Sequence, residues 1–276
     1  ATLAGSLIDA LCRAGQKDDF IDPKDALPII SKRTLCVVVD TYQVGLVESK
    51  EILEKCGKVA VIDHHRKGVG YIQNPDLVCH EPYSSSASEL VTELLQYVGD
   101  RDDKPNRVEA EGLLSGILLD TQDFTLHTGV RTFEAAAFLR RCGADITRVR
   151  KMFRDDMESY RAKAEAMRRA EVYREEYAIA QCPGDIDSPT VLAAQTANEL
   201  LDISGIKASF VLTVYEGKIY MSARSIDEVN VQIIAEKLGG GGHINSAGAQ
   251  FDHTNIEEAV NALKETIDKM IEEGDI

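Results

Sequence analysis

The fold is decided by two short apolar runs, TLCVVVD at residues 34–40 and KVAVIDHH at residues 58–65. Both runs are rich in β-branched residues and reach an aspartate, Asp40 in the first and Asp63 in the second, as buried strands that end at a sheet edge do. The segment between them, VESKEILEKCG at 47–57, has the apolar spacing of an amphipathic helix. Strand, helix and strand in this order predict a parallel β-α-β unit.

The sequence around this unit predicts an α/β lobe over residues 1–154. Helical patterns recur at about 85–98, 107–119 and 132–141. The stretch 155–176 is charged, lacks glycine and proline, and is rich in strong helix formers. We therefore expect a long linker helix after the first lobe.

A smaller, mixed α+β lobe is expected over residues 177–276. Its strand YAIAQC precedes a helix near TVLAAQTANELL, and the runs ASFVLTVY and KIYMSARS flank Glu216-Gly217 as a hairpin with a tight turn. A short helix then leads into a glycine run, a final strand and a C-terminal amphipathic helix. The predicted architecture is thus a parallel-sheet lobe joined by a helix to a mixed lobe.

Candidate metal ligands follow the apolar runs. Asp63, His64 and His65 come directly after the second strand, Asp40 ends the first, and Asp120 closes the apolar run GLLSGILLD. The carboxyl edges of parallel strands gather ligands in open α/β folds, and mixed carboxylate and imidazole donors suit ions such as Mn²⁺. Taken singly, the tripeptide is more often a surface turn and each aspartate a cap. Three apolar runs that all end in such residues favour a metal site.

A second candidate site is an anion-binding pattern in the second lobe. It comprises Arg224, Gly239, Gly240, Gly241, Gly242, His243 and Asn245. Glycines let backbone amides approach an anion closely, and an arginine can bind a phosphate through two hydrogen bonds. A flexible linker and an ordinary exposed arginine are the alternatives. The position of the run inside a lobe favours phosphate binding.

Composition and net charge limit the classes of molecule that the chain is expected to bind. The chain has 276 residues, with 31 Lys and Arg against 46 Asp and Glu, so its formal charge is −15. This charge opposes binding to duplex nucleic acid, although metal ions can reverse the sign of the electrostatic potential inside a cleft.

The six cysteines form no C-x-x-C pair, which favours a reducing, cytosolic compartment. No apolar run is long enough to cross a membrane, and because the first residue is Ala1 we expect a longer parent protein.

The motifs VVVDT, VIDHH, LLDTQDF and GGGGH resemble those of the DHH phosphoesterases that carry a DHHA1 domain. The phrases EPYSSSASELVTELLQY, SARSIDEVNVQIIAEKLGGGGH and FIDPKDAL resemble the GdpP-type cyclic-di-AMP phosphodiesterases. Members of that type are membrane proteins with a PAS-like sensor and a degenerate GGDEF domain. The resemblance therefore implies a parent anchored in the bacterial cell membrane, with this part on the cytoplasmic face.

The resemblance also implies residue roles. Asp40 would bridge two Mn²⁺ ions, and His64 and Asp120 would ligate one of them. His65 would contact the scissile phosphate or act as general acid, and Asp63 would orient the histidines.

Substrate contacts are implied in both lobes. Arg224, His243 and the glycine backbone, with Asn245, would hold the far phosphate or base of the substrate. Ser85 and Ser86 open a predicted helix and would bind phosphate at its N-terminus, with simple N-capping as the alternative.

One family motif is absent. A His-x-x-x-Asp-x-Asp motif is expected before the VVVDT strand, but no histidine precedes His64. Those residues would supply most ligands of one metal ion. Either the sequence begins after them, or one of the two metal sites is lost and a two-metal mechanism fails.

We expect the chain to hydrolyse cyclic di-AMP to 5′-pApA by two-metal, in-line attack of water, and to form a homodimer. Preference for adenine over guanine rests on the resemblance alone. The alternatives are a phosphoesterase of pApA or short oligonucleotides (nanoRNA), and a non-catalytic module that binds cyclic dinucleotides. A processive DNA exonuclease is disfavoured because the acidic chain lacks a basic track.

Overall fold

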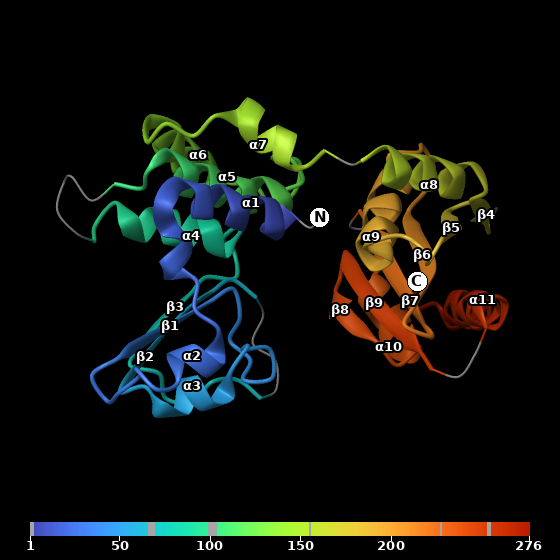
Figure 1. The fold of residues 1–276 in the computed structure, drawn as a ribbon. Coiled ribbons are helices and arrows are strands. Elements are labelled where there is room, and N and C mark those ends of the chain that lie inside the picture. The colour runs from blue at the N-terminus through green and yellow to red at the C-terminus, as the bar shows by residue number, and fades with distance from the viewer. Residues whose placement is uncertain (1–2, 66–69, 99–103, 155, 227, 253–254) are drawn as a thin grey trace. The chain divides into compact units, whose positions relative to one another are not determined.

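The structure is a computed structural model, and it describes residues 3–65, 70–98, 104–154, 156–226, 228–252 and 255–276 (Figure 1). The chain forms two compact units, and the first of them ends at Arg154. Each unit has hydrophobic cores of its own.

The first unit contains a parallel sheet. Its strands lie in the order β1 (Leu35–Val39), β2 (Lys58–Asp63) and β3 (Leu77–His80). Helix α3 (Lys50–Lys55) lies between β1 and β2 in the chain, and the Ser49 side chain caps its N-terminus. The β-branched strand residues bury one face of the sheet in a small core with Tyr42. The predicted parallel β-α-β unit is confirmed.

Further helices complete this unit, and the last three of them form a second core. They are α1 (Leu3–Leu11), α2 (Pro23–Ala26), α4 (Ala87–Leu95), α5 (Arg107–Asp120), α6 (Val130–Arg141) and α7 (Ile146–Met152), with a π-helical turn (Cys12–Gln16) and a 3-10 turn (Lys17–Asp19) after α1. Apolar residues of α5, α6 and α7 pack together, among them the fully buried Ile117, Leu139 and Val149. A capping box at Asn106 starts α5, so the polar residue before the apolar run fixes where this helix begins.

The second unit is a six-stranded mixed sheet with helices on both faces (Figure 1). Its strands, in the order β4-β5-β6-β7-β9-β8, are β4 (Glu171–Tyr173), β5 (Tyr177–Cys182), β6 (Ala208–Tyr215), β7 (Lys218–Ser225), β8 (Gly241–His243) and β9 (Ser246–Phe251). Its helices are α8 (Met157–Arg168), α9 (Pro189–Leu200), α10 (Val231–Lys237) and α11 (Ile256–Glu273). Alternate residues of β5 and β6 face α8 and α9 on one side and α10 and α11 on the other. The predicted mixed α+β fold is confirmed.

The helix expected over 155–176 is shorter than predicted. Within the described part of that range, α8 ends at Arg168, and residues 171–173 form the edge strand β4, which pairs antiparallel with β5. Arg174 and Glu175 both have positive φ and make the turn between these strands. The Tyr173 hydroxyl also donates to Asp268 of α11, at 2.8 and 2.9 Å. Pairing with β5 and contact with α11 outweigh the helix propensity of this stretch.

The glycine run contains a strand that sequence reasoning missed. β8 pairs with β9, and a Cβ on Gly240, the residue just before β8, would lie 2.0 Å from the Gly248 carbonyl oxygen. A Cβ on Gly242, which has a φ of 146°, would lie 2.5 Å from the Ala247 Cα. Close packing is therefore one reason for these glycines, besides any contact with an anion.

Replacing Gly242 with alanine is expected to destabilise the second unit by about 2 kcal/mol or more, because overpacking and a strained φ add. A Cβ on Gly241 would meet no atom within 4 Å, and Gly241 has no positive φ, so Gly241→Ala is the matched control. Urea unfolding of both variants measures the difference. Equal stability of the two would contradict the close-packing reason.

Candidate metal centre

The candidate centre lies where three parallel strands end. Asp40 follows β1 directly, and its backbone N–H donates to the Ile62 carbonyl oxygen at 3.0 Å. His64 follows β2, whose last residue Asp63 is paired with His80, the last residue of β3. The parallel register therefore brings polar residues from all three strands to one edge of the sheet.

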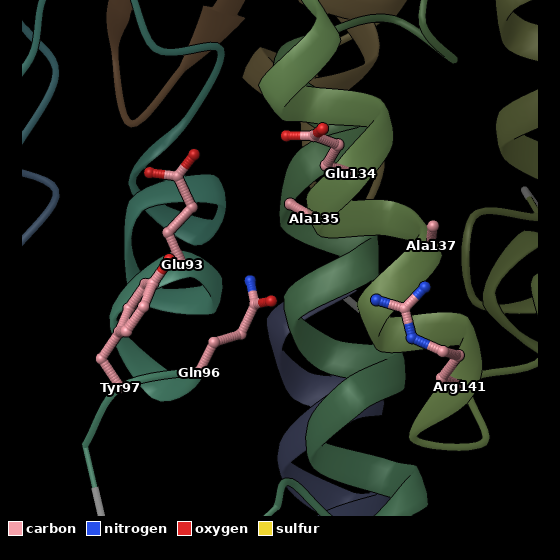
Figure 2. A pocket seen from close by; sticks show the side chains of 7 residues that line it. All are labelled: Glu93, Gln96, Tyr97, Glu134, Ala135, Ala137 and Arg141. Atoms are coloured by element: carbon pink, nitrogen blue, oxygen red, sulfur yellow. The ribbon is translucent and has the colours of Figure 1, made fainter.

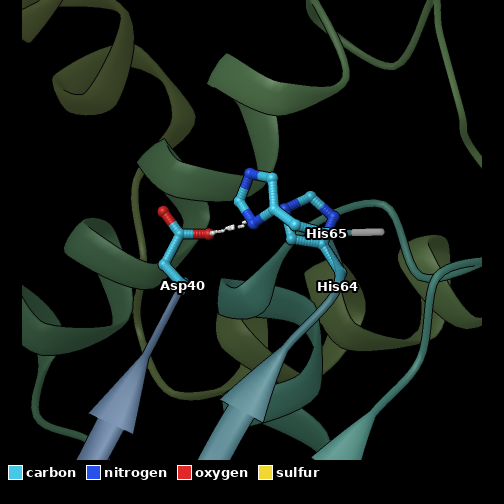
Figure 3. A group of neighbouring side chains, drawn as sticks. All are labelled: Asp40, His64 and His65. Carbon is cyan, nitrogen blue, oxygen red and sulfur yellow. Dashed lines mark ion pairs between the residues drawn. The ribbon is translucent and has the colours of Figure 1, made fainter. Parts of the chain in front are cut away.

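Asp40, His64 and His65 form the one group of possible metal-binding side chains found in the described ranges. One ligand atom from each lies within 4.8 Å of the others. The His64 Nε2 is 3.5 Å from the Asp40 Oδ1, and Figure 3 shows this carboxylate facing the histidine rings. Two ligands of one ion with bonds of about 2.1 Å lie about 3.0–3.5 Å apart, so this pair fits a shared ion. Mixed carboxylate and imidazole donors suit Mn²⁺ and similar ions.

Asp40 has an uncommon backbone conformation. Its φ is 64°, in the left-handed region that aspartate tolerates better than most residues. Such conformations persist where the surrounding structure demands them and are frequent at functional sites. This turn aims the carboxylate at the histidines of the neighbouring strand end.

His65 is held differently from His64. Asp63 is fully buried, and its Oδ1 accepts hydrogen bonds from the His65 Nδ1 at 2.8 Å and from the His65 backbone N–H at 3.2 Å. The His80 Nε2 donates to the His65 carbonyl oxygen at 2.6 Å. Because Nδ1 donates to Asp63, any contact of the His65 ring with a phosphate or a metal ion would be made through Nε2. An aspartate that orients a histidine in this way suits acid–base chemistry.

Asp120, predicted as a metal ligand, is the last residue of α5 and is not part of the group formed by Asp40, His64 and His65. All four residues lie in the described part of the chain. Protein atoms around the Asp120 carboxyl group remove water and raise its pKa, even though the residue keeps exposed surface. His64 and His65 lower this pKa and Asp40 raises it, so Asp120 interacts electrostatically with the group. Its role as a ligand stays a prediction.

His64 contacts a backbone carbonyl that sequence reasoning missed. Its Nδ1 lies 3.3 Å from the Ser84 carbonyl oxygen, which can only accept, so Nδ1 carries the proton and Nε2 faces Asp40. Burial opposes protonation of the ring, but Asp40 and Asp120 favour the charged form and raise the His64 pKa. Metal binding at Nε2 would therefore compete with a proton.

Ser85 and Ser86, predicted to bind phosphate, are buried. The Ser86 hydroxyl accepts from the Glu89 backbone N–H at 3.0 Å, which is the N-capping role left as the alternative. The Ser85 hydroxyl donates to the Glu89 carboxylate at 2.6 Å. Phosphate binding by the Ser85 hydroxyl would require that hydroxyl to leave Glu89, whereas the Ser86 hydroxyl accepts from Glu89 and keeps its own proton to donate.

The predicted substrate residues of the second unit gather on neighbouring strands. Arg224 of β7 and His243 of β8 both pair with Ser246 of β9, one on each side, so their side chains project from the same face of the sheet. Asn245 lies in the turn between β8 and β9, and its carbonyl oxygen accepts from the Ser225 N–H at 3.1 Å. Burial lowers the pKa of Arg224, which nonetheless stays charged at neutral pH. A cationic side chain beside glycine backbone suits a phosphate group.

A surface hollow lies between α4 and α6 (Figure 2). Glu93, Glu134, Tyr97 and Arg141 are among its lining residues, and none of the predicted site residues is. Its two carboxylates do not favour an anionic nucleotide.

Among the helices described, none combines the length and apolar composition that crossing a bilayer requires.

Comparisons with known proteins identify both units. Residues 3–117 match the DHH family, N-terminal domain, and residues 175–272 match the DHHA1 domain. The cyclic-di-AMP phosphodiesterase GdpP of Geobacillus thermodenitrificans is 46% identical over 92% of this chain and 39% of its own length. The cyclic-di-AMP phosphodiesterase PdeA of Listeria monocytogenes is 42% identical over 91% of this chain and 38% of its own length. The chain thus spans about two fifths of these relatives.

A solved structure shares the fold. It is that of an exopolyphosphatase-related protein from Bacteroides fragilis, with a TM-score of 0.78 and 22% identity over 89% of this chain and 74% of the other. At this level of identity the likeness concerns architecture alone.

Proposed function

The chain belongs to the DHH family and carries a DHHA1 domain, and from this premise we propose that it is a metal-dependent phosphodiesterase that hydrolyses cyclic di-AMP to 5′-pApA. The proposal rests chiefly on one observation, the pairing of the His64 Nε2 with the Asp40 carboxylate at the carboxyl edge of the sheet. Relatives 46% and 42% identical to this chain are cyclic-di-AMP phosphodiesterases, which supports this substrate.

Asp40 and His64 would hold a divalent ion, with Asp120 as a further ligand. Their donor set fits Mn²⁺, and the buried Asp63 beside them supplies negative charge that a cation would balance. Bound metal would lower the pKa of a water molecule and neutralise charge on the phosphate. A second ion would need ligands beyond this group.

Other residues of the chain would protonate the leaving group and bind the substrate. His65, oriented by Asp63 through Nδ1, would contact the scissile phosphate and protonate the leaving ribose oxygen from Nε2. Arg224, His243 and the glycine backbone would bind the far phosphate or base, with Asn245 beside them. The second unit would thereby position the nucleotide for attack.

The test is incubation with cyclic di-AMP and Mn²⁺, followed by chromatography of the products. We expect 5′-pApA to form and EDTA to stop its formation. Turnover of pApA that is much faster than turnover of cyclic di-AMP would instead favour the short-oligonucleotide phosphoesterase. Calorimetric binding of cyclic di-AMP without any product would favour the non-catalytic module.

A further inference from the structure

Glu89 is a buried carboxylate that the proposed chemistry does not use. It lies in the first turn of α4 with 2% of its surface exposed. Its carboxylate accepts hydrogen bonds from the hydroxyls of Ser84 at 2.9 Å, Ser85 at 2.6 Å and Thr132 at 2.6 Å, and from the Ser85 backbone N–H at 3.4 Å. Burial opposes ionisation, but these donors favour the carboxylate and hold the pKa of Glu89 below its usual value. The buried Glu89 carboxylate is therefore stabilised in its charged form by the hydrogen bonds that it accepts.

These hydrogen bonds hold the backbone that contacts His64. Ser84 donates its hydroxyl to Glu89 and offers its carbonyl oxygen to the His64 Nδ1 at 3.3 Å. In the neutral ring the opposite nitrogen, Nε2, then carries the lone pair, and it lies 3.5 Å from Asp40. A continuous chain of contacts runs from Glu89 through Ser84 to the side of His64 that faces away from Asp40.

We propose that Glu89 is a positioning residue that fixes the tautomer and orientation of His64 for metal binding. The inference rests on the proposed function, since it assigns a metal to His64. Partners of this kind on the far nitrogen of a metal-binding histidine set its tautomer and typically change metal affinity 10–100-fold when removed. Glu89 also joins α4 to Thr132 of α6, so a purely structural role is the competing explanation.

The deciding variant is Glu89→Gln, which keeps the size of the side chain and removes its charge. Glu111→Gln is the matched control, because Glu111 is another fully buried glutamate, and its ion-pair partners are Arg148 of α7 at 3.0 Å and Arg107 of α5 at 4.0 Å. Ser84→Ala removes one donor to Glu89 while keeping the carbonyl group, and it serves where Glu89→Gln fails to fold.

Two measurements are made on each protein. Nitrogen-15 NMR of the histidine rings without metal reports the tautomer of His64, and calorimetry with Mn²⁺ alone reports metal affinity. For Glu89→Gln we expect loss of the single Nδ1–H tautomer and about 10–100-fold weaker Mn²⁺ binding. For Ser84→Ala we expect a smaller change in the same direction, and for Glu111→Gln an unchanged tautomer and affinity.

Wild-type tautomer and affinity in Glu89→Gln, or in Ser84→Ala if the first variant does not fold, would overturn the inference and leave the proposed function standing. An equal loss of affinity in Glu111→Gln would also overturn it, because the effect would then be one of general stability. Failure of the wild-type chain to bind Mn²⁺ would overturn the proposed function instead. The metal-free NMR comparison would still test the link between Glu89 and His64.

Discussion

Replacing Asp40 with asparagine is expected to lower Mn²⁺-dependent hydrolysis of cyclic di-AMP about a thousandfold or more. A bound metal ion contributes several kcal/mol of transition-state stabilisation, and each 1.36 kcal/mol corresponds to about a factor of ten in rate. The Asp40 carboxylate lies 3.5 Å from the His64 Nε2, so its loss removes the negative donor of the pair. Asparagine tolerates the φ of 64° at this position, and we therefore expect the fold to survive.

The control for this variant is Asp123→Asn. Asp123 is also an exposed aspartate with positive φ, at 57°, but it is absent from the group around His64. Initial rates at saturating Mn²⁺ and circular dichroism of both variants give the comparison. A rate for Asp40→Asn within about tenfold of wild type, with Asp123→Asn equal to wild type, would remove Asp40 from the mechanism.

Replacing His65 with glutamine is expected to lower kcat by about 10²–10⁴, the usual contribution of a positioned acid or base. The His65 Nδ1 donates to Asp63 at 2.8 Å, so contact with the substrate would be made through Nε2. If His65 acts on the phosphate or the leaving group, Mn²⁺ affinity should change by less than about threefold, because the principal metal ligands remain.

Parallel calorimetry and steady-state kinetics separate the two roles of His65. A fall in kcat with unchanged metal affinity supports a catalytic role. A fall in Mn²⁺ affinity as large as the fall in kcat would make His65 a third metal ligand, as its inclusion in the group with Asp40 and His64 allows. His80→Gln is a useful companion, since it alters the contact with the His65 carbonyl oxygen and removes the ring contact with Tyr42.

Local patterns were sufficient to predict the elements on which the site is built. The apolar runs that end at Asp40 and Asp63 are strands because β-branched residues suit a buried parallel sheet, and their parallel order brings their ends together. The hairpin turn at Glu216-Gly217 was also predictable from the sequence, and both residues adopt positive φ in the observed hairpin.

Features that depend on contacts distant in sequence were not predictable in this way. Glu89 looks like one more polar residue on an amphipathic helix, and only the packing of Thr132 against it reveals a buried carboxylate. His80 ends the third strand at the same edge as Asp63, and that position was the signal that could have drawn attention to it. The strand within the glycine run pairs across a tight turn, where glycine normally weakens a strand prediction.

Anomalous diffraction from crystals of the chain grown with Mn²⁺ tests the central claim most directly. We predict a strong anomalous peak within about 2.5 Å of both the Asp40 carboxylate and the His64 Nε2. Crystals that contain Mn²⁺ elsewhere but show no peak between these two side chains would contradict the claim.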